Sequence, residues 1–406
     1  MIKSIFYNRI FIILCVVMLI YSSGYALSTV FTFGIYIEAL FAYLFLFPIM
    51  LVHFKKRANI LTTSFILLIV MVVSTFITSG LTSATAYLSI IFKIIIAFGV
   101  VTLYDFHDFT RYYLKIMKFV AVTSLIGHYL INYSNYALDL PIVTNINSVP
   151  YGVGYLFFYI TWIPERNCGI FWEPGLFATF LVIAIIFELF YKKNRRSFLN
   201  IFLFIAAILT TRSSAGYGLL LLILFLVMLK SLYFVKDVRM RKVAMCLVFM
   251  SSVIILLNYN YVIEFLNLSD NEVTIKLTSE QLATQSRILA INHNLTTFLN
   301  NPLFGAGISQ AYRNVRHVAD TSTSTFMLGV FGFMGVQYTF YLVYGILKNR
   351  NNDVYVNIMI LLIFLLLINK EPHQGIVFSW CILFYFLKNS SNKSKDVLPN
   401  KSKTAQ

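Results

Sequence analysis

The stretch KKRANILTTSFILLIVMVVSTFITS, residues 55–79, places three basic residues just before an uncharged apolar run that begins at Ile60. About 20 consecutive apolar residues are enough for an α-helix to cross the hydrocarbon core of a bilayer. Lys and Arg are enriched in the cytoplasmic loops of membrane proteins. The stretch therefore predicts a transmembrane helix whose first end faces the cytoplasm.

Apolar runs of this kind recur along the chain, and they predict an all-α, polytopic membrane protein. Of the 406 residues, 59% are hydrophobic and only 12% are charged, which is rare in a soluble domain. We predict about twelve spans, at residues 10–27, 31–52, 60–79, 85–104, 117–132, 169–191, 198–210, 215–230, 243–258, 323–346, 354–369 and 375–388. They form one transmembrane domain over residues 1–388, and residues 389–406 form a polar cytoplasmic tail.

The basic residues sort to one side of these spans. With the N-terminus in the cytoplasm, 24 of the 32 Lys and Arg residues fall in cytoplasmic segments. This distribution favours an even number of spans and places both termini in the cytoplasm. The net charge of +16 is then a topology signal and does not indicate nucleic-acid binding.

Two outer segments are longer than simple connectors, residues 133–168 and 259–322. Loops of this length usually carry function or local structure. The second contains a predicted amphipathic helix from Ser279 to Asn300, which ends just before Asn301 and Pro302. Its apolar face, expected to lie on the helix bundle or on the membrane surface, consists of Ile288, Ile291, Leu295 and Phe298.

Eight basic residues depart from the pattern because they lie within spans or on the outer side. They are Lys93, Arg166, Arg212, Lys276, Arg287, Arg313, Arg316 and Lys370. A charge at the bilayer centre costs at least ~2.5 kcal/mol, so such a residue usually faces a cavity or a partner. Lys93 lies midway along an apolar run, and it has two open interpretations: an ion pair with Glu38, or contact with a substrate.

Several of the other cations lie where an anion would bind at the outer surface. Arg212 is part of the short turn TTRSSAG, residues 210–216, which is either an anion site at a helix N-terminus or an ordinary polar turn. Residues 281–319 contain no acid, and their arginines are Arg287, Arg313 and Arg316. Because arginine binds phosphate bidentately, we infer a lipid-linked phosphate or pyrophosphate as the ligand; a solvated charged face is the alternative.

The stretch RNCGIFWEPG, residues 166–175, opens the sixth span from the outer side. Arg166 and Glu173 are either functional residues or an ion pair that holds the helix at the interface. Pro174, with the glycine after it, indicates a break or a helix start near Glu173. Trp172 is either an interfacial anchor or a platform for a sugar ring.

This stretch resembles a motif of the O-antigen and capsular polysaccharide polymerases, the Wzy type, through the pattern Arg-x-x-Gly-Ile-Phe-x-Glu-Pro-Gly. Three further pieces are similar to that family. NPLFGAG at residues 301–307 resembles the end of its long outer loop, and GVFGFMG at residues 329–335 resembles the glycine-rich span that follows. The turn around Arg212 is similar to its arginine-containing turn. Together these motifs cover roughly residues 165–340.

The resemblance implies a glycosyltransferase in the bacterial plasma (inner) membrane. Its donor would be a growing glycan on undecaprenyl pyrophosphate, and its acceptor would be one oligosaccharide repeat unit on the same carrier. It implies no cofactor and no metal. The partners besides the lipid bilayer would be a chain-length regulator protein and a flippase, and no nucleic acid. The four cysteines, which show no CxxC spacing, do not indicate a metal site either.

The same resemblance suggests roles for individual residues. The candidate catalytic residues are Arg166, Glu173, His317 and Asp320. The candidate contacts to the pyrophosphate or the glycan are Lys93, Trp172, Arg212, Arg287, Arg313 and Arg316. Family members often carry a His-Asn pair just before the glycine-rich span, whereas this chain has His317 and Asp320 there. The general base is therefore open between His317, Asp320 and Glu173.

Two other functions stay open. An O-antigen ligase uses the same donor and also has a long outer loop, but it transfers the glycan to lipid A core; the Glu-Pro-Gly motif favours a polymerase. A flippase for the lipid-linked repeat unit can also have twelve spans. Flippases usually have short loops and internal repeats, so the outer segment at 259–322 argues against one.

Overall fold

The structure is a computed structural model, and it describes residues 9–29, 34–53, 60–79, 83–134, 140–145, 148–154, 156–192, 197–233, 283–312, 321–349 and 352–391. The span predicted at 243–258 and the polar tail from residue 392 onward lie outside the described residues.

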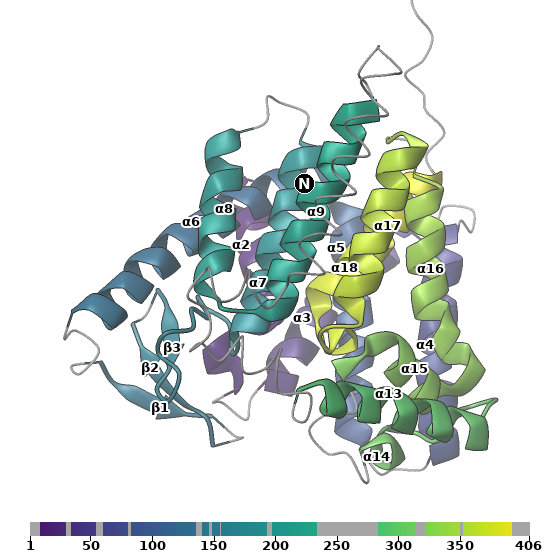
Figure 1. Ribbon diagram of the computed structural model, residues 1–406. Coiled ribbons are helices and arrows are strands. Elements are labelled where there is room, and N and C mark those ends of the chain that lie inside the picture. Colours follow the sequence, from purple (N-terminus) through teal and green to yellow (C-terminus); the bar gives the residue numbers. More distant parts are fainter. Residues whose placement is uncertain are drawn as a thin grey trace, which may run out of the picture.

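Apolar helices make up most of the described chain, which confirms the prediction of a helical membrane protein (Figure 1). Five are long and apolar enough to cross a membrane: α4 (Ile60–Ser79), α5 (Ala84–Leu103), α6 (Phe106–Tyr133), α7 with its π-helical end η3 (Pro174–Ile186 and Phe187–Tyr191), and the interrupted helix of α15 (Thr323–Phe331), η5 (Gly332–Gly335) and α16 (Val336–Leu347). Shorter apolar helical stretches are α2 (Arg9–Tyr21), Tyr36–Phe45 within α3 (Gly34–His53), α8 (Phe198–Thr210), Ser214–Lys230 within α9 (Ser214–Tyr233) and α17 (Val354–Ile368). The predicted count of about twelve spans stays a prediction.

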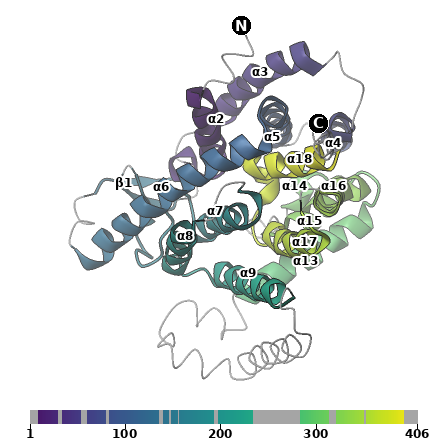
Figure 2. The same ribbon diagram turned by 90° about the horizontal axis from the view of Figure 1, so that it is seen from above.

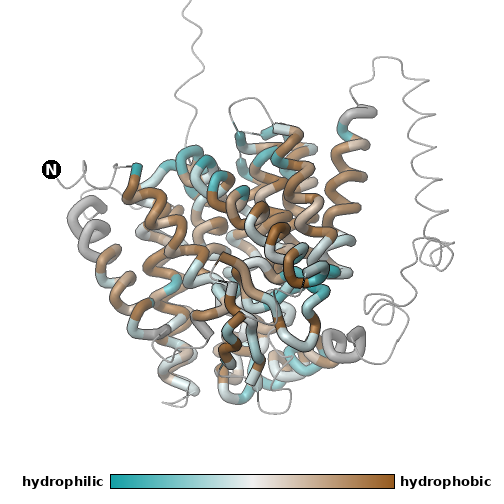
Figure 3. Tube along the Cα trace, turned by 90° about the vertical axis from the view of Figure 1, so that its left-hand side faces the viewer, coloured by the Kyte–Doolittle hydropathy of each residue, from teal (hydrophilic) through white to brown (hydrophobic). Residues whose placement is uncertain are grey.

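The surface of these helices suits a lipid environment. Figure 3 shows hydrophobic residues along the helices, with hydrophilic residues gathered toward their ends. Large apolar side chains are exposed on several helices, for example Ile77, Phe202 and Leu221. Apolar surface of this extent is characteristic of contact with a membrane or a partner.

The core of the bundle is formed by α7 and by α18 (Val377–Ser391). Helices α6, α8 and α9 pack around α7, while α5 and α16 pack against α18 (Figure 2). Tyr113 of α6 joins the two groups: its hydroxyl donates to Phe180 O (2.7 Å) on α7, and its ring centroid lies 4.7 Å from that of Phe378 on α18. Because both core helices are buried nearly all round, their sequences are apolar without a helical period.

Helix α6 is longer than predicted. The span predicted at 117–132 belongs to a helix that begins at Phe106, and its first turns carry charged residues. There Arg111 lies 3.0 Å from Asp108 in an ion pair with half-exposed partners. The prediction was wrong at this end because a span predicted from hydropathy stops where charged residues begin. The helix itself can continue beyond the apolar layer.

Two other spans are shorter than predicted because the backbone turns. The span predicted at 10–27 ends as a helix at Tyr21, and Gly24 then turns the chain with a φ of +125°. The span predicted at 169–191 begins at Pro174, which takes the first helical position. Proline fits there because its missing N–H has no partner in the first turn anyway.

The outer loop predicted at 133–168 contains a small antiparallel sheet, which corrects the all-α prediction at this point. Its strands, in the order β1-β2-β3, are β1 (Ile142–Thr144), β2 (Pro150–Val153) and β3 (Phe158–Ile160). A Cβ added at Gly152 would lie 2.0 Å from the Tyr159 ring, so the ring covers the glycine. The strands are only three or four residues long, too short to produce a recognisable alternation in the sequence.

The second outer loop contains α13 (Ala283–Asn300) and the one-turn helix α14 (Ile308–Ala311), at the same end of the bundle as the sheet (Figure 1). Helix α13 confirms the predicted helix and its end. Its packing face differs from the predicted one, because Ala290 and Asn294 are buried whereas Leu295 is 39% exposed. Small side chains let α13 approach α15, to which the Asn294 amide donates a hydrogen bond (3.3 Å).

Candidate functional site

The segment before α7 is held firmly against the sheet. Phe158 N donates to Gly169 O (2.6 Å), and the Cys168 thiol donates to Phe158 O (3.0 Å). Burial raises the pKa of the Cys168 thiol to about 12, so this cysteine stays protonated and unreactive. The segment is therefore a fixed part of the end of the molecule that carries the sheet.

Glu173 stands at the junction between this segment and α7. It is the N-cap residue in an extended conformation, so of the two interpretations, a break or a helix start, the structure has a helix start. The half-buried carboxylate does not cap the helix. Within the described residues Glu173 forms no ion pair, so the proposed interfacial pair with Arg166 is not the arrangement found. Burial, then Cys168 and Glu173, raise the pKa of Tyr151 on β2, which places the carboxylate near that phenol.

The Arg166 segment docks on the turn between α8 and α9. Asn167 N donates to Thr210 O (3.0 Å), and the Asn167 amide donates to the Thr210 hydroxyl (2.9 Å). Arg166 Nε lies 3.5 Å from Thr211 O. These bonds bring the two arginine-containing motifs of the sequence together, and both Arg166 and Arg212 act electrostatically on Tyr217 of α9.

Arg212 occupies a strained position in this turn. Its φ of +46° lies in the left-handed region, which costs a non-glycine residue roughly 1–2 kcal/mol. Its backbone is set by Thr211, whose hydroxyl donates to Ile208 O (2.7 Å) and lies 3.3 Å from Ser213 N, which donates to it. The side chain is half-buried, and no hydrogen bond or ion pair joins it to another described residue. Strain held at a charged residue is a recurring property of binding sites.

Trp172 connects the segment to the end of α2. Its backbone N–H donates to Gly24 O (3.0 Å), and its backbone carbonyl accepts from the Tyr151 hydroxyl (2.7 Å). A Cβ at Gly24 would approach the Trp172 ring to 3.4 Å, so the ring lies close over this glycine. The half-buried ring packs on the small apolar cluster that includes Phe158. The backbone of Trp172 thus anchors the turn, and its ring remains half-buried.

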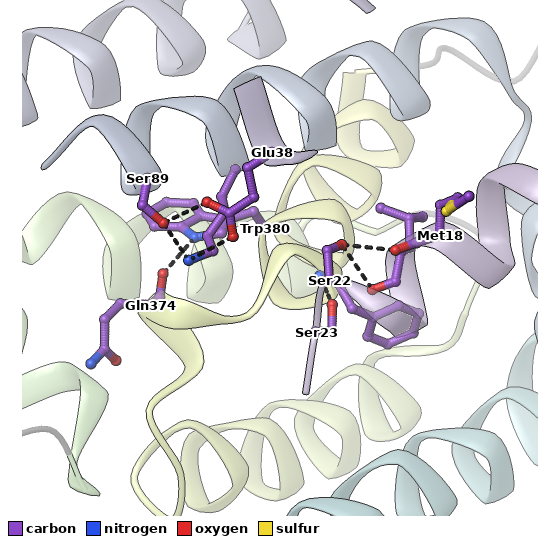
Figure 4. A network of polar contacts seen from close by, with 10 residues as sticks. Met18, Ser22, Ser23, Glu38, Ser89, Gln374 and Trp380 are labelled. Carbon is purple, nitrogen blue, oxygen red and sulfur yellow. Dashed lines mark hydrogen bonds and ion pairs between the residues drawn. The ribbon is translucent and has the colours of Figure 1, made fainter. Parts of the chain in front are cut away.

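Lys93 forms the ion pair with Glu38, which is the first of its two interpretations. Its Nζ lies 3.2 Å from a carboxylate oxygen of Glu38 on α3 and donates to Ser89 Oγ (2.7 Å). The Ser89 hydroxyl in turn donates to Glu38 (2.6 Å). Figure 4 draws this network together with the hydrogen bond from Trp380 to Gln374. None of these partners belongs to the Arg166 segment, so Lys93 forms a separate network.

Several predicted site residues cannot be placed. Those outside the described residues are Arg313, Arg316, His317 and Asp320. Arg287 lies in the first half of α13, and its side chain is outside the described part. Their roles stay predictions.

A buried cation that the sequence did not place in the site supports the start of α7. Lys370, after α17, is only 5% exposed, and its Nζ donates to Gly175 O (2.8 Å) and to the Thr179 hydroxyl (3.4 Å). Glu371 lies 3.8 Å from the same ammonium. A Cβ at Gly175 would lie 2.6 Å from a Glu371 carboxylate oxygen, so only glycine lets this pair come so close to α7.

The turn that carries Lys370 is bound to α15 as well. The Thr323 hydroxyl accepts from His373 N (2.8 Å) and lies 2.8 Å from Gln374 Oε1. Burial, and then the charge of Lys370, lower the pKa of His373 to about 3, so this imidazole is neutral. Its Nδ1 lies 2.7 Å from Ser379 Oγ. The turn thus joins α7, α15 and α18 through buried polar contacts.

A signal for this turn is present in the sequence. NKEPHQG, residues 369–375, is a polar run between two apolar spans, and Lys370 is one of the eight cations that depart from the charge pattern. It was not proposed as a site residue because its partner Gly175 is 195 residues away in the chain.

No protein-family model and no curated protein matches this chain. The chemistry of this region is therefore inferred from its residues alone. Arg166, Arg212, Glu173 and the half-buried Trp172 lie around the start of the buried helix α7, and Glu173 forms no ion pair with another described residue. Such a group suits an anionic ligand that carries a polar, ring-shaped portion.

Proposed function

We propose that this protein is a polysaccharide polymerase, which joins oligosaccharide repeat units on undecaprenyl pyrophosphate into O-antigen or capsule chains at the outer face of the bacterial plasma membrane. The observation that carries the proposal is the docking of the Arg166 segment on the Arg212 turn. This contact places the two arginine-bearing segments side by side, where both arginines act electrostatically on Tyr217, so an anion that binds there is attracted by both charges. The planar fork of arginine fits a phosphate group well.

The donor pyrophosphate is assigned to these two arginines. In the reaction an acceptor hydroxyl attacks the anomeric carbon of the donor glycan, and the bond from that carbon to the pyrophosphate oxygen breaks. The new glycosidic bond forms, the hydroxyl proton passes to a general base, and undecaprenyl pyrophosphate leaves with the electron pair. Arg166 and Arg212 stabilise the negative charge that develops on the leaving group.

Glu173 is the candidate general base among the described residues, because its carboxylate is half-buried and is not used to cap α7. His317 and Asp320 remain candidates on sequence grounds. Trp172 provides an aromatic face next to Glu173, and aromatic faces commonly hold sugar rings. Lys370 is assigned a positioning role, since it fixes the first turn of α7 without lying at the Arg166–Arg212 pair.

The assignment is tested with Arg212→Gly. Glycine adopts a left-handed backbone without steric cost, so this change removes the guanidinium and relieves the turn. We expect normal amounts of inserted protein, thermal stability equal to or above the wild type, and no chain longer than a single repeat. The measurement is a gel of surface polysaccharide from a deletion strain that expresses each variant.

Arg166→Ala should behave in the same way, whereas Arg111→Ala on α6 serves as the matched control and should leave chain length unchanged. Arg111 is half-exposed at the opposite end of the bundle. Wild-type chain lengths in both the Arg166 and Arg212 variants would show that these arginines do not bind the donor.

The same strains separate the alternative functions. In the deletion strain, surface molecules capped with one repeat indicate a polymerase. Long chains that remain on undecaprenyl pyrophosphate would instead identify an O-antigen ligase. Single repeats confined to the cytoplasmic leaflet would identify a flippase, and either of these results would overturn the proposal.

A further inference from the structure

A large open cleft lies at the outer end of the molecule, between the end of α4, helix α13 and the segment 300–310. Its volume is about 1120 Å³. This exceeds the usual volume of a pocket for a drug-sized ligand, roughly 300–1,000 Å³, and it suits a ligand of several linked rings. Residues that line it include Ser79, His293, Thr297, Asn301, Phe304 and Gln310.

The chemistry of the lining is neutral and polar. Hydroxyl, amide and imidazole groups dominate it, and none of the lining residues that the structure describes is Lys, Arg, Asp or Glu. The side chains of Asn301 and Gln310 are exposed, so their amides can both donate and accept hydrogen bonds with a ligand. This composition disfavours a phosphate and disfavours a lipid tail. It favours an uncharged molecule that is rich in hydroxyl groups.

An aromatic ring completes this set. Phe304 lines the cleft and is 43% exposed, although phenylalanine usually buries most of its surface. Its backbone carbonyl accepts a hydrogen bond from the Thr75 hydroxyl on α4 (3.1 Å), so the residue is held in place while its ring faces solvent. An exposed aromatic ring beside exposed amides is the usual composition of a sugar-binding surface.

The walls of the cleft are fixed before any ligand arrives. Ala306 N donates to Gly329 O (3.0 Å) on α15, and Ile308 N donates to the Tyr87 hydroxyl (2.9 Å) on α5. His293 lies 3.1 Å from Ala311 O, which joins α13 to α14. A site whose backbone is already ordered loses less entropy when it binds a ligand.

We propose that this cleft binds uncharged sugar residues of an oligosaccharide chain. This inference rests on the proposed function in one respect, since it takes the chain to be the lipid-linked glycan of that reaction. The cleft lies at the same end of the bundle as the sheet and the start of α7 (Figure 1). Helix α15 lies between the two regions: it supports the segment 300–310, and Thr323 at its start contacts the Lys370 turn.

The cleft has a role separate from that of the arginines. The pyrophosphate and the reacting sugar bind at Arg166 and Arg212, while sugars farther along the glycan bind in the cleft. A chain that remains bound between transfers is extended again before it leaves. Loss of the cleft therefore shortens the polymer without preventing the bond from forming.

The test measures binding directly. The probe is a set of oligosaccharides obtained by partial acid hydrolysis of the surface polysaccharide of the native cells. Saturation-transfer NMR with the purified full-length protein in detergent gives the affinity. We expect the wild type to bind, and the double variant Asn301→Ala, Gln310→Ala to bind at least about tenfold more weakly, since two hydrogen bonds are lost.

Matched variants separate the cleft from general damage. Phe304→Ala should lose binding and Phe304→Tyr should keep it, because only the ring is needed. Asn292→Ala, an exposed amide on α13 outside the cleft, and Phe202→Ala, a ring that is 71% exposed on α8, should bind as the wild type does. Absence of binding by the wild type, or equal binding by the cleft variants, would overturn the inference.

The outcomes distinguish this inference from the proposed function. In cells, the cleft variants should still polymerise but with a shorter average chain, whereas Arg212→Gly should make no polymer and still bind the probe. If the deletion strain shows that the protein is not a polymerase, probe binding that depends on Asn301 and Phe304 would still support a glycan cleft.

Discussion

At the scale of single residues, the decisive interactions are buried charges with specific partners. A lysine that is 5% exposed is costly unless its ammonium is hydrogen-bonded, and Lys370 meets this requirement through Gly175 O and Thr179. Lys93 meets it through Glu38 and Ser89. Arg212 differs, because its backbone is strained and the described residues give its side chain no recorded partner. The first two cations maintain the structure, and we propose that the third binds a ligand.

We expect Lys370→Met to lower the free energy of unfolding in detergent by about 3 kcal/mol, the lower end of the range for breaking a buried ion pair. The double variant Lys370→Met, Glu371→Gln should lose less than the sum of the two single losses, by about 1 kcal/mol or more, because the two residues interact. Lys230→Met is the control. It breaks a pair with Asp353, which is 53% exposed, and should cost less than about 1 kcal/mol. Additive losses for Lys370 and Glu371 would show that they do not act as a pair.

Sequence reasoning at this scale identified charges but not their partners. It selected Lys93 and named Glu38 as one possible partner, and it selected Arg166 and Arg212 as separate anion-binding residues. That the segments of the latter two meet follows from bonds between Asn167 and Thr210, which no sequence spacing indicates. Cys168 and Gly169 fix that contact, and their role depends on a sheet that the sequence did not predict.

At the scale of elements, the two glycine-containing motifs of the second half, residues 301–307 and 329–335, pack against each other. Gly305 has a φ of +73° and Gly332 a φ of +62°, and a Cβ at Gly332 would lie 2.5 Å from Gly305 N. Phe333 N donates to Pro302 O across the same contact (2.6 Å). The break between α15 and α16 thus exposes backbone groups that the loop from Asn301 binds.

We expect Gly332→Ala to destabilise the protein by more than about 2 kcal/mol, because alanine adds both left-handed strain and a collision with backbone atoms that cannot rotate away. Gly218→Ala on α9 is the control, since a Cβ there meets nothing within 4 Å. It should be neutral or stabilising by up to about 1 kcal/mol. Melting temperatures in detergent measure both changes, and equal melting temperatures for the two variants would contradict the close contact.

The elements were predicted well where hydropathy alone determines them and poorly where backbone geometry does. The ranges 60–79 and 198–210 coincide with α4 and α8. The span predicted at 323–346 has the right ends but not its interruption at Gly332–Gly335, since glycines are common in transmembrane helices. The sheet was not predicted, because its short strands are held by contacts with α6 and with the segment before α7.

At the scale of the whole molecule, the sheet, α13, α14 and the start of α7 lie at one end of the helix bundle (Figure 1). The charge distribution of the sequence predicts that this end faces away from the cytoplasm. The bundle separates the two ends by a buried core around α7 and α18. The orientation, like the number of spans, stays a prediction.

The orientation is tested with single cysteines in a background that lacks the four native ones. We expect Trp162→Cys, at a side chain that is 59% exposed, to react with a membrane-impermeant maleimide in right-side-out spheroplasts. Val354→Cys, at a side chain that is 74% exposed at the start of α17, should react only after the membrane is permeabilised. The opposite pattern would invert the topology and remove the donor from the proposed site.

The bond between Lys370 and Gly175 also has a consequence for the time course of synthesis. The two residues are 195 positions apart, so at about 5–20 residues per second the ribosome makes Lys370 about 10–40 s after Gly175. Until then the first turn of α7 lacks the ammonium that holds it. A nascent chain therefore contains Arg166 and Arg212 long before the first turn of α7 is held in place.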